Sequence, residues 1–82
     1  MKLIVYYGKS CPKCPAAKKV AKEAAAEKKL EYEERDIEQN MIEALQLQIA
    51  STPSIVLDNE VLFRSEAPSK QELLAEIEKR CD

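Results

Sequence analysis

The sequence predicts an α/β fold in which three helices cover a mixed four-stranded sheet, with the element order β-α-β-α-β-β-α. Three observations support this prediction: a short apolar run followed at once by a helical pattern, two β-rich runs separated by turn residues, and the chain length. The chain has 82 residues, 45% of them hydrophobic and 34% charged, which is the composition of one compact domain over residues 1–82. A chain of this size buries only about 60 to 65% of its unfolded surface, so we expect short connections.

The first half of the chain predicts a strand, a helix and a second strand. Residues 3–7 form a continuous apolar run, which is typical of a strand buried on both faces. Residues 12–28 are rich in Ala, Lys and Glu, and Pro12 suits the first helical position because a missing N–H costs nothing there. Residues 31–37 hold few bulky apolar side chains, which favours a strand at or near a sheet edge. This order requires a parallel strand pair with a right-handed crossover.

The next segment predicts a second helix and then a hairpin. Residues 39–48 form an amphipathic helix, whose apolar stripe at helical spacing is Met41, Ile42, Leu45 and Ile49. Residues 54–57 and 61–64 are short β-rich runs, and the turn residues 58–60 between them have the length and chemistry that close an antiparallel hairpin.

The C-terminal segment predicts the third helix. Ser69 and Glu72 have the spacing of a capping box, and the apolar stripe that follows is Leu73, Leu74 and Ile77. Cys81 continues this stripe, so we interpret it as a small apolar residue that closes the helix. The alternative is a terminal thiol that forms intermolecular disulfides or is glutathionylated, because chain ends fray.

The charge distribution is uneven although the net charge is only −2. Residues 1–29 carry eight Lys and two Glu, a net charge of +6, whereas residues 30–82 carry five Lys or Arg and thirteen Asp or Glu, a net charge of −8. We interpret the lysines as a solvated helix face. Because the overall balance is acidic and no aromatic residues interleave with the basic run, we expect no nucleic-acid partner.

Cysteine usage and the N-terminus indicate the compartment. The N-terminal apolar stretch is too short for a signal peptide and lacks a small-residue cleavage site, and no segment is long enough to span a membrane. Three cysteines, an odd number, do not make the disulfide framework of a secreted miniprotein. We therefore expect a cytoplasmic, monomeric protein without membrane contact.

Cys11 and Cys14 carry the chemistry that the sequence predicts. Their spacing lets the two sulfurs meet across one helical turn, at the junction where the first strand passes into the first helix. The positive end of the helix dipole, with Lys9 and Lys13 nearby, favours a thiolate at Cys11. We therefore expect Cys11 to be the nucleophile and the more buried Cys14 to be the resolving thiol, so that the pair cycles between dithiol and disulfide.

The same two cysteines could instead be half of a metal site or a merely packed pair. Zinc usually takes four Cys or His ligands, and this chain has no histidine and only one further cysteine. A strand-to-helix junction with a proline between the cysteines argues against simple packing. We therefore expect a redox site without metal or other cofactor.

Two motifs together resemble the thioredoxin superfamily over essentially the whole chain. They are Cys11-Pro12-Lys13-Cys14 after a β-run and Thr52-Pro53 ahead of the hairpin; C-P-x-C is typical of glutaredoxins and of small glutaredoxin-like proteins that behave as thioredoxins. The resemblance implies the minimal thioredoxin fold and a redox disulfide between Cys11 and Cys14. It also implies a cis Thr52-Pro53 bond beside the Cys11 sulfur, with the Thr52 backbone pairing to an extended substrate. Pro12, Lys13, Thr52 and Pro53 are the substrate-binding residues that it suggests.

Two departures from the family pattern shape the expected function. Glutaredoxins usually follow the hairpin with a Gly-Gly pair that holds glutathione, and residues 63–68 contain none. We therefore expect a protein-disulfide reductase that a thioredoxin-reductase-type flavoenzyme re-reduces, with a glutathione-dependent glutaredoxin as the alternative. Thioredoxins also carry a buried aspartate on the first strand, where this chain has Val5. Proton transfer at Cys14 must then use water or a lysine such as Lys13; the alternative interpretation of Lys13 is an exposed residue that only aids solubility.

Two rival functions remain from other classes. One is a metal-binding module in which two chains share an iron-sulfur cluster through Cys11, with glutathione as an extra ligand. The other is a non-catalytic interaction domain of the same fold, which two intact cysteines disfavour.

Overall fold

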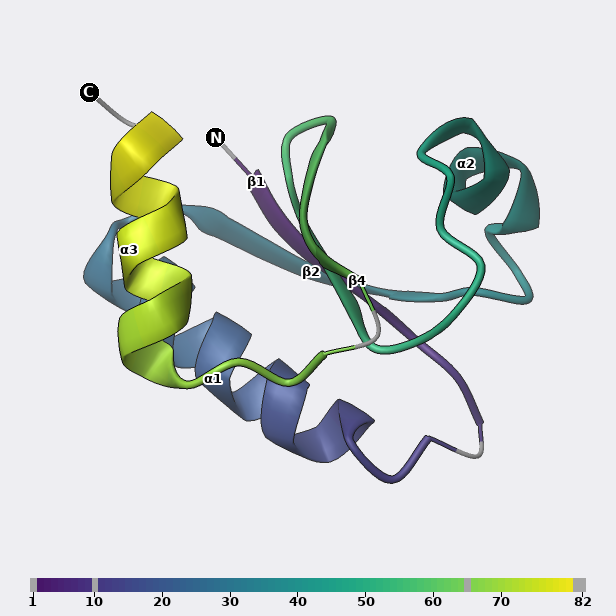
Figure 1. Ribbon diagram of the computed structural model, residues 1–82, viewed down its shortest axis with the longest axis horizontal. Coiled ribbons are helices and arrows are strands. Elements are labelled where there is room, and N and C mark those ends of the chain that lie inside the picture. The colour runs from purple at the N-terminus through teal and green to yellow at the C-terminus, as the bar shows by residue number, and fades with distance from the viewer. Residues whose placement is uncertain (1, 10, 65, 81–82) are drawn as a thin grey trace.

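The computed structural model describes residues 2–9, 11–64 and 66–80, and its elements follow the predicted order (Figure 1). They are β1 (Lys2–Tyr7), α1 (Cys14–Glu27), β2 (Glu31–Asp36), α2 (Met41–Gln46), β3 (Ser54–Leu57), β4 (Glu60–Arg64) and α3 (Lys70–Arg80). Cys81, with both interpretations of its thiol, lies outside the described residues. Within the described part of the chain, no helix is long and apolar enough to cross a membrane.

The four strands form one mixed sheet in the order β2-β1-β3-β4. β1 and β2 run parallel from the Lys2–Glu31 pair to the Tyr7–Asp36 pair, which confirms the predicted parallel pairing and places β2 at an edge. β3 is antiparallel to β1, and β4 is antiparallel to β3 across the predicted hairpin. Both parallel strands therefore end on the same side of the molecule, where their connections to α1 and α2 begin.

One face of the sheet holds the larger apolar core, beneath α1 and α3, which lie beside each other in Figure 1. Alternate residues of a strand point to opposite faces, so Leu3 and Val5 of β1 face these two helices. Their partners in this core are Ala21, Ala24, Ala25, Ile55, Leu57, Leu73 and Ile77. The small alanines of α1 let its backbone approach the sheet closely.

The opposite face is covered by α2 and is packed differently from the prediction. Ile4 and Tyr6 of β1 meet Ala44, Ile49 and Val56 there. Of the apolar stripe that the sequence indicates for the second helix, only Ile49 is buried; the other three members are 56%, 74% and 66% exposed: Met41, Ile42 and Leu45. The helix is also shorter than expected, and Ile49 reaches the core from beyond its end.

Helical geometry explains which stripe of α2 is buried. At about 100° per residue, Glu43, Ala44 and Leu47 share one side, and the exposed apolar residues occupy the other. Ala44 is buried against the sheet and Leu47 is partly buried. The side with the smallest side chain faces the sheet, so the helix can lie close to it.

α1 and α2 end with the same hydrogen-bonded turn. After α1, Leu30 N–H donates to the Ala25 carbonyl at 2.8 Å, and Lys29 has φ 57°. After α2, Ile49 N–H donates to the Ala44 carbonyl at 2.8 Å, and Gln48 has φ 59°. Both are Schellman-type ends, in which the left-handed position is usually a glycine. This chain has one glycine, so lysine and glutamine fill these positions.

The predicted capping box of α3 is present. Glu72 N–H donates to Ser69 Oγ at 3.2 Å, and Ser69 N–H donates to Glu72 Oε1 at 3.3 Å. The two exchanged bonds satisfy backbone donors at the start of the helix. They direct the chain from the hairpin back across the sheet, where Leu73 and Ile77 are fully buried.

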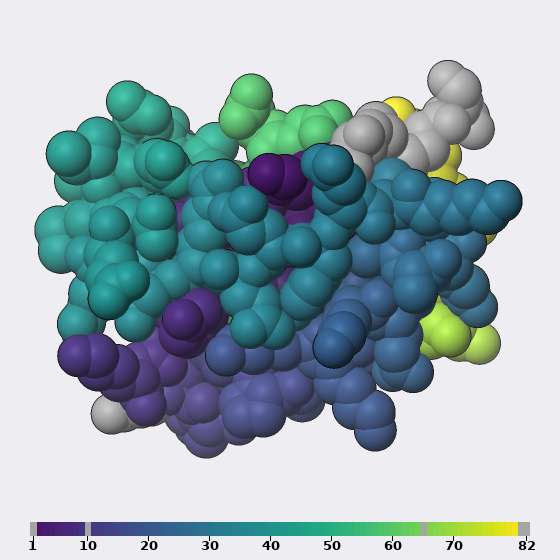
Figure 2. All heavy atoms as spheres, turned by 180° about the vertical axis from the view of Figure 1, so that it is seen from behind, coloured from purple at the N-terminus to yellow at the C-terminus, as the bar shows by residue number. Residues whose placement is uncertain are grey.

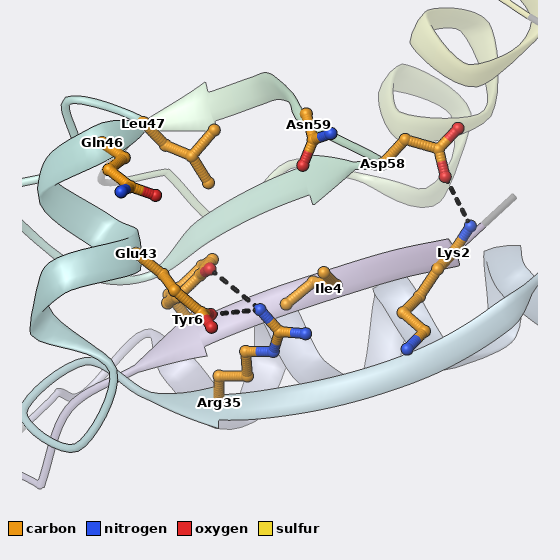
Figure 3. Close-up of a pocket in the computed structure, with 9 residues that line it drawn as sticks. All are labelled: Lys2, Ile4, Tyr6, Arg35, Glu43, Gln46, Leu47, Asp58 and Asn59. Atoms are coloured by element: carbon orange, nitrogen blue, oxygen red, sulfur yellow. Dashed lines mark hydrogen bonds and ion pairs between the residues drawn. The ribbon is translucent and has the colours of Figure 1, made fainter.

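A hollow of about 890 Å³ lies on the α2 side of the sheet, between α2 and the β3–β4 turn (Figure 3). Ile4 and Tyr6 lie at its floor, and Arg35 crosses it to donate hydrogen bonds to Tyr6 Oη at 3.4 Å and to Glu43. Arg35 also donates to Glu33. These bonds raise the pKa of Arg35 above its usual value, the bond to Glu33 being the main cause. Arg35 therefore ties α2 to β2 across a face that the short helix only partly covers.

Candidate active site

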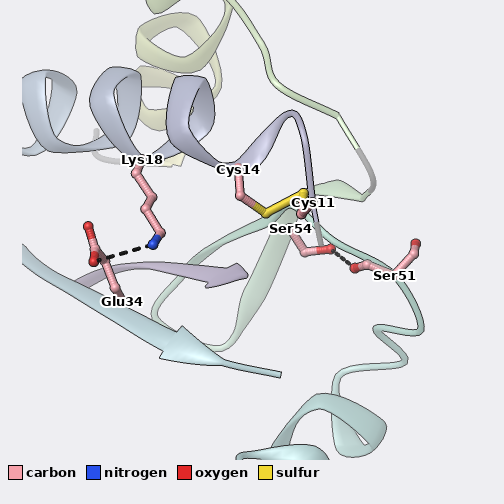
Figure 4. Close-up of a disulfide and its surroundings, with 6 residues drawn as sticks. All are labelled: Cys11, Cys14, Lys18, Glu34, Ser51 and Ser54. Atoms are coloured by element: carbon pink, nitrogen blue, oxygen red, sulfur yellow. Dashed lines mark hydrogen bonds and ion pairs between the residues drawn. A yellow bond between two sulfur atoms is a disulfide. The ribbon is translucent and has the colours of Figure 1, made fainter. Parts of the chain in front are cut away.

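The structure joins Cys11 and Cys14 in a disulfide at the junction between β1 and α1 (Figure 4). Their Cα atoms are 5.4 Å apart, within the range that a disulfide spans without backbone movement. Cys14 lies at the start of α1 and is 3% exposed, whereas Cys11 in the preceding loop is half-buried. The two sulfurs therefore differ in accessibility although they are three residues apart.

The helix begins later than the sequence predicts. Cys14 is the first residue of α1, so the prediction that Pro12 takes the first helical position is wrong, and Pro15 lies in the first turn instead. Cys14 N–H donates to the Cys11 carbonyl at 3.4 Å, which closes a turn with Pro12 at its second position. Proline suits that position because its fixed φ matches the turn. Pro12 and Lys13 project from this turn and are exposed.

The first turn of α1 carries no acidic residue, so nothing there neutralises the positive end of the helix. Lys13 occupies the N-cap position and makes no side-chain capping hydrogen bond. Cys11 precedes this positive end directly. The electrostatic surroundings of the disulfide are therefore positive on the side of the helix start.

The second motif lies against the cysteine loop. The Thr52-Pro53 peptide bond is cis, as the family resemblance implies, and Pro53 is buried. A Cβ atom added to Gly8 would lie 3.1 Å from Thr52 Oγ1, so the absence of a side chain at Gly8 lets the two loops meet closely. Ser54 is buried and its hydroxyl donates to the Ser51 carbonyl at 2.8 Å, which closes the loop around the proline (Figure 4).

A charged pair near the disulfide was not expected from the sequence. Lys18 Nζ lies 3.9 Å from Glu34 Oε1 (Figure 4). The same Nζ lies 3.7 Å from the centre of the Tyr7 ring. The Tyr32 hydroxyl donates a hydrogen bond to Glu34 at 2.8 Å. The pKa of Tyr32 is raised, mainly by burial and secondly by this hydrogen bond. In the sequence, the signal that could have identified Lys18 as a neighbour of the disulfide is its position one helical turn after Cys14. The partner on β2 could be found only once the strands were placed.

The loop between β2 and α2 also approaches the redox loop. Ile37 N–H donates to the Tyr7 carbonyl at 2.9 Å, and Lys9 Nζ lies 3.8 Å from Glu38 Oε2. Asp36 shapes this loop, because its carboxylate accepts the Glu38 N–H at 2.8 Å. The connections that leave the two parallel strands therefore lie side by side.

The surroundings of the cysteines offer few groups for proton transfer or metal binding. Val5 is fully buried where thioredoxins have an aspartate, and the chain has no histidine. Across residues 2–9, 11–64 and 66–80, no cluster of three or more His, Cys, Asp or Glu side chains could hold a metal ion. What the site presents is a disulfide with one accessible and one shielded sulfur.

Comparison with known proteins assigns this arrangement to a family. The thioredoxin domain family matches residues 1–78 of the chain. A thioredoxin of Methanocaldococcus jannaschii is 35% identical over 82 residues, which cover 98% of this chain and 95% of the relative.

Solved structures share the fold at lower identity. Thioredoxin 1 from Thermosipho africanus superposes with a TM-score of 0.78 at 19% identity, over 98% of this chain and 93% of that protein. Thioredoxin-2 of a malaria parasite superposes with a TM-score of 0.76 at 20% identity, over 95% of this chain and 81% of that protein. These likenesses confirm the minimal thioredoxin fold.

Proposed function

Because this chain belongs to the thioredoxin family, we propose that it reduces disulfide bonds in other proteins by dithiol exchange through Cys11 and Cys14. It is a thioredoxin-like thiol-disulfide oxidoreductase with a C-x-x-C pair. The observation that carries the finer proposal is the unequal burial of the two sulfurs, since a half-buried Cys11 can be reached by a substrate and Cys14 cannot. In this proposal residues 1–82 act as a single monomeric domain in a reducing compartment such as the cytosol.

The proposed exchange has two steps. The Cys11 thiolate attacks one sulfur of the substrate disulfide, forms a mixed disulfide and releases the other substrate sulfur as a thiolate. The Cys14 thiolate then attacks the Cys11 sulfur, which releases the second substrate thiolate and closes the Cys11–Cys14 disulfide. The substrate gains two electrons and two protons, and the protein loses them. Closure needs little movement, because the Cα atoms already lie 5.4 Å apart in the disulfide form.

The local charges favour Cys11 as the thiolate in the reduced protein. A free cysteine has a pKa of about 8.5, and cysteines in C-x-x-C motifs at helix starts commonly fall to about 3.5 to 7.5. Cys11 precedes an α1 start that has no acidic residue in its first turn, with the exposed Lys13 beside it. Pro12, Lys13, Thr52 and Pro53 form the proposed contact surface for the substrate backbone.

In this proposal, water or a lysine accepts the proton that the Cys14 thiol loses. Lys13 is exposed, whereas Lys18 is held between Glu34 and the Tyr7 ring. The family aspartate is absent, since Val5 stands in its place. Water with Lys13 is therefore the route that we propose.

The proposed electron donor is a flavoenzyme of the thioredoxin-reductase type. Residues 63–68 lack the Gly-Gly pair with which glutaredoxins hold glutathione, and a small charged tripeptide needs such preorganised contacts. A protein donor gains affinity over a wider surface. A glutathione-dependent reaction is the alternative, because Lys9, Lys13 and Arg64 are exposed cations that could hold the glutathione carboxylates.

Alkylation and cysteine variants test the assignment of roles. With the reduced protein at mildly acidic pH, iodoacetamide should modify Cys11 first, because only a thiolate reacts. Cys14→Ser should complete the first attack and stall as a mixed disulfide, and Cys11→Ser should lose insulin disulfide reduction. Cys81→Ser is the control, with turnover close to that of the native chain. Faster alkylation of Cys14, or equal partial losses in the two motif variants, would contradict the roles.

A second experiment compares the electron donors. Reduction of the Cys11–Cys14 disulfide is followed with millimolar glutathione and, separately, with micromolar thioredoxin reductase and NADPH. The proposal expects the flavoenzyme to be the faster donor. Saturable, efficient turnover with glutathione would instead assign the protein to the glutaredoxins, and visible absorbance of the purified protein would indicate an iron-sulfur cluster.

A further inference from the structure

The outward side of α2 is unusual on this molecule. Among the described residues, the large hydrophobic side chains that are exposed are Met41, Ile42 and Leu45, and all three belong to this one helix. We refer to these three side chains as the α2 apolar face. Exposed apolar residues are ordinary when they are scattered singly, whereas a group on one surface indicates a contact site.

Contacts on the sheet-facing side of α2, opposite the α2 apolar face, fix the orientation of the helix. Ala44 is buried against the sheet, and Glu43 accepts a hydrogen bond from Arg35 of β2. The end of the helix is held as well, because Ile49 N–H donates to the Ala44 carbonyl at 2.8 Å. Rotation of the helix to bury the α2 apolar face would break these contacts. The exposed face is therefore a fixed feature of the fold.

The α2 apolar face lies at the end of the molecule that also carries the redox loop. The loop that leads into α2 hydrogen-bonds to the end of β1 through Ile37 and Tyr7, and Glu38 pairs with Lys9 of the redox loop. In Figure 2 the teal α2 region and the purple loop after β1 occupy the same side of the surface, above and below each other. A protein that reaches Cys11 from this side can also contact α2.

The chain segment that contains α2 has an excess of negative charge. Residues 36–63 contain five acidic residues and no Lys or Arg. Glu38 lies in the loop before α2 and is paired with Lys9, and Glu43 lies on the sheet side of the helix and is paired with Arg35; their side-chain exposures are 62% and 51%. A complementary partner surface is therefore apolar with basic residues around it.

The size and charge of the face argue against a second copy of this chain as its occupant. A stable protein interface buries about 800 Å² on each partner, which three side chains on a six-residue helix do not provide. A two-fold contact would also bring the same glutamates of both copies together. Transient redox encounters use smaller interfaces, and a mixed disulfide at Cys11 would hold the partner during the contact.

We propose that the α2 apolar face docks the disulfide-bearing protein substrate of Cys11, through a substrate segment that is apolar and flanked by basic residues. The inference rests on the proposed function and extends it, since the contact adds substrate selectivity away from the disulfide itself. The longest dimension of the molecule is 31 Å. An extended substrate arm of about ten residues spans roughly 33 Å, so it can reach from Cys11 to α2.

Synthetic peptides provide the test. Each carries one cysteine activated as a mixed disulfide with thionitrobenzoate, followed by an arm of about ten residues. The arm ends in leucine and lysine, in serine and lysine, or in leucine and glutamate. The rate constant for thionitrobenzoate release by the reduced protein is divided by the rate constant with the symmetric thionitrobenzoate disulfide, which has no arm. We expect the leucine-lysine arm to give the largest ratio and its advantage to shrink at high salt.

Two triple variants separate apolar docking from a structural effect. Met41→Gln, Ile42→Gln and Leu45→Gln together keep side-chain length and helix propensity but remove the apolar surface. They should lower the ratio for the leucine-lysine arm about fivefold to tenfold, the usual effect of losing an interface anchor. Met41→Leu, Ile42→Leu and Leu45→Met keep the surface apolar and should retain the ratio within about twofold. Circular dichroism checks that both variants fold.

The outcomes distinguish this inference from the proposed function. If neither peptides nor the armless disulfide react with the native protein, the proposed function fails. If they react but the glutamine variant leaves the ratios unchanged, or the apolar variant loses as much as the glutamine variant, the docking site is overturned. A dimer at assay concentration that the glutamine variant dissociates would assign the face to a second copy and would also overturn the proposal.

Discussion

The two faces of the sheet are covered in different ways. On one face, α1 and α3 pack against each other and against the strands, and Leu73 and Ile77 of α3 are fully buried. On the other face, α2 contributes one buried alanine, Ala44, and is held by the ion pair between Glu43 and Arg35. The first face uses its large apolar side chains for packing, whereas the second leaves Met41, Ile42 and Leu45 exposed.

The difference between the two faces separates residues that stabilise the fold from residues that remain available for contact with other proteins. A domain of this size has a small margin of stability, so burying large side chains beneath α1 and α3 is the main source of its folding free energy. α2 contributes less to the apolar packing and leaves Met41, Ile42 and Leu45 exposed. We therefore expect the same substitution to change the free energy of unfolding strongly on the first face and weakly on the exposed side of α2.

The largest expected difference is between two isoleucines. Ile77→Ala should lower the free energy of unfolding by about 2 to 5 kcal/mol, because it leaves a cavity in the core beneath α3. Ile42→Ala makes the same chemical change on the α2 apolar face and should alter it by no more than about 0.5 kcal/mol. Urea unfolding followed by circular dichroism measures both. Equal losses would show that the α2 face is packed in solution.

A substitution beneath α2 tests how closely this helix is seated. Ala44→Leu should lower the free energy of unfolding by about 1 to 3 kcal/mol, because the added carbons meet the sheet where Ala44 is 1% exposed. Ala26→Leu, at an exposed position of α1, is the matched control and should have an effect within about 0.5 kcal/mol. Thermal unfolding compares the pair. A neutral Ala44→Leu would mean that α2 moves away from the sheet at little cost.

The left-handed residues at the two helix ends should respond alike on both faces. Lys29→Gly after α1 and Gln48→Gly after α2 should each raise the free energy of unfolding by about 0.5 to 1 kcal/mol, since φ values of 57° and 59° cost glycine little. Gln46→Gly, inside α2, is the control and should lower it by about 1 kcal/mol. If only one end gains stability, the other end is not held in solution in the Schellman turn that the structure shows.

The smallest expected effect is the pH dependence of two partly exposed groups of ion pairs, one at Glu33 and one at Glu76. Hydrogen bonds from Arg35 and then Lys2 lower the pKa of Glu33 on β2, and bonds from Lys79 and then Arg80 lower the pKa of Glu76 on α3. A carboxylate whose folded pKa is lowered adds stability above its unfolded pKa and loses it as the pH falls through the folded pKa. Both contributions should therefore be present at neutral pH and disappear below about pH 4.3.

Matched glutamine variants measure these contributions. Glu33→Gln and Glu76→Gln should each reduce the loss of stability on acidification and leave its pH dependence near neutral unchanged. Because both carboxylates are partly exposed, with side-chain exposures of 35% for Glu33 and 26% for Glu76, added salt should diminish the difference from the native chain. A stronger pH dependence near neutrality in either variant would contradict the assignment.

Local patterns in the sequence determined the element order, the hairpin, the Ser69–Glu72 capping box and the position of Cys11 and Cys14. These features depend on period, turn chemistry and spacing, which a few neighbouring residues carry. The cis bond before Pro53 followed from the family resemblance and not from a local pattern, because few X-Pro bonds are cis.

Tertiary structure decided what the local patterns left open. The six residues of α2 offer two possible inward sides, and close approach to the sheet selected the side with Ala44 over the more hydrophobic one. Contacts between distant segments, such as Lys18 with Glu34 and Gly8 with Thr52, also exist only once the strands are paired. The sequence by itself thus determined where the paired cysteines lie, because spacing is a local property, whereas packing against the sheet decided which side of α2 is exposed.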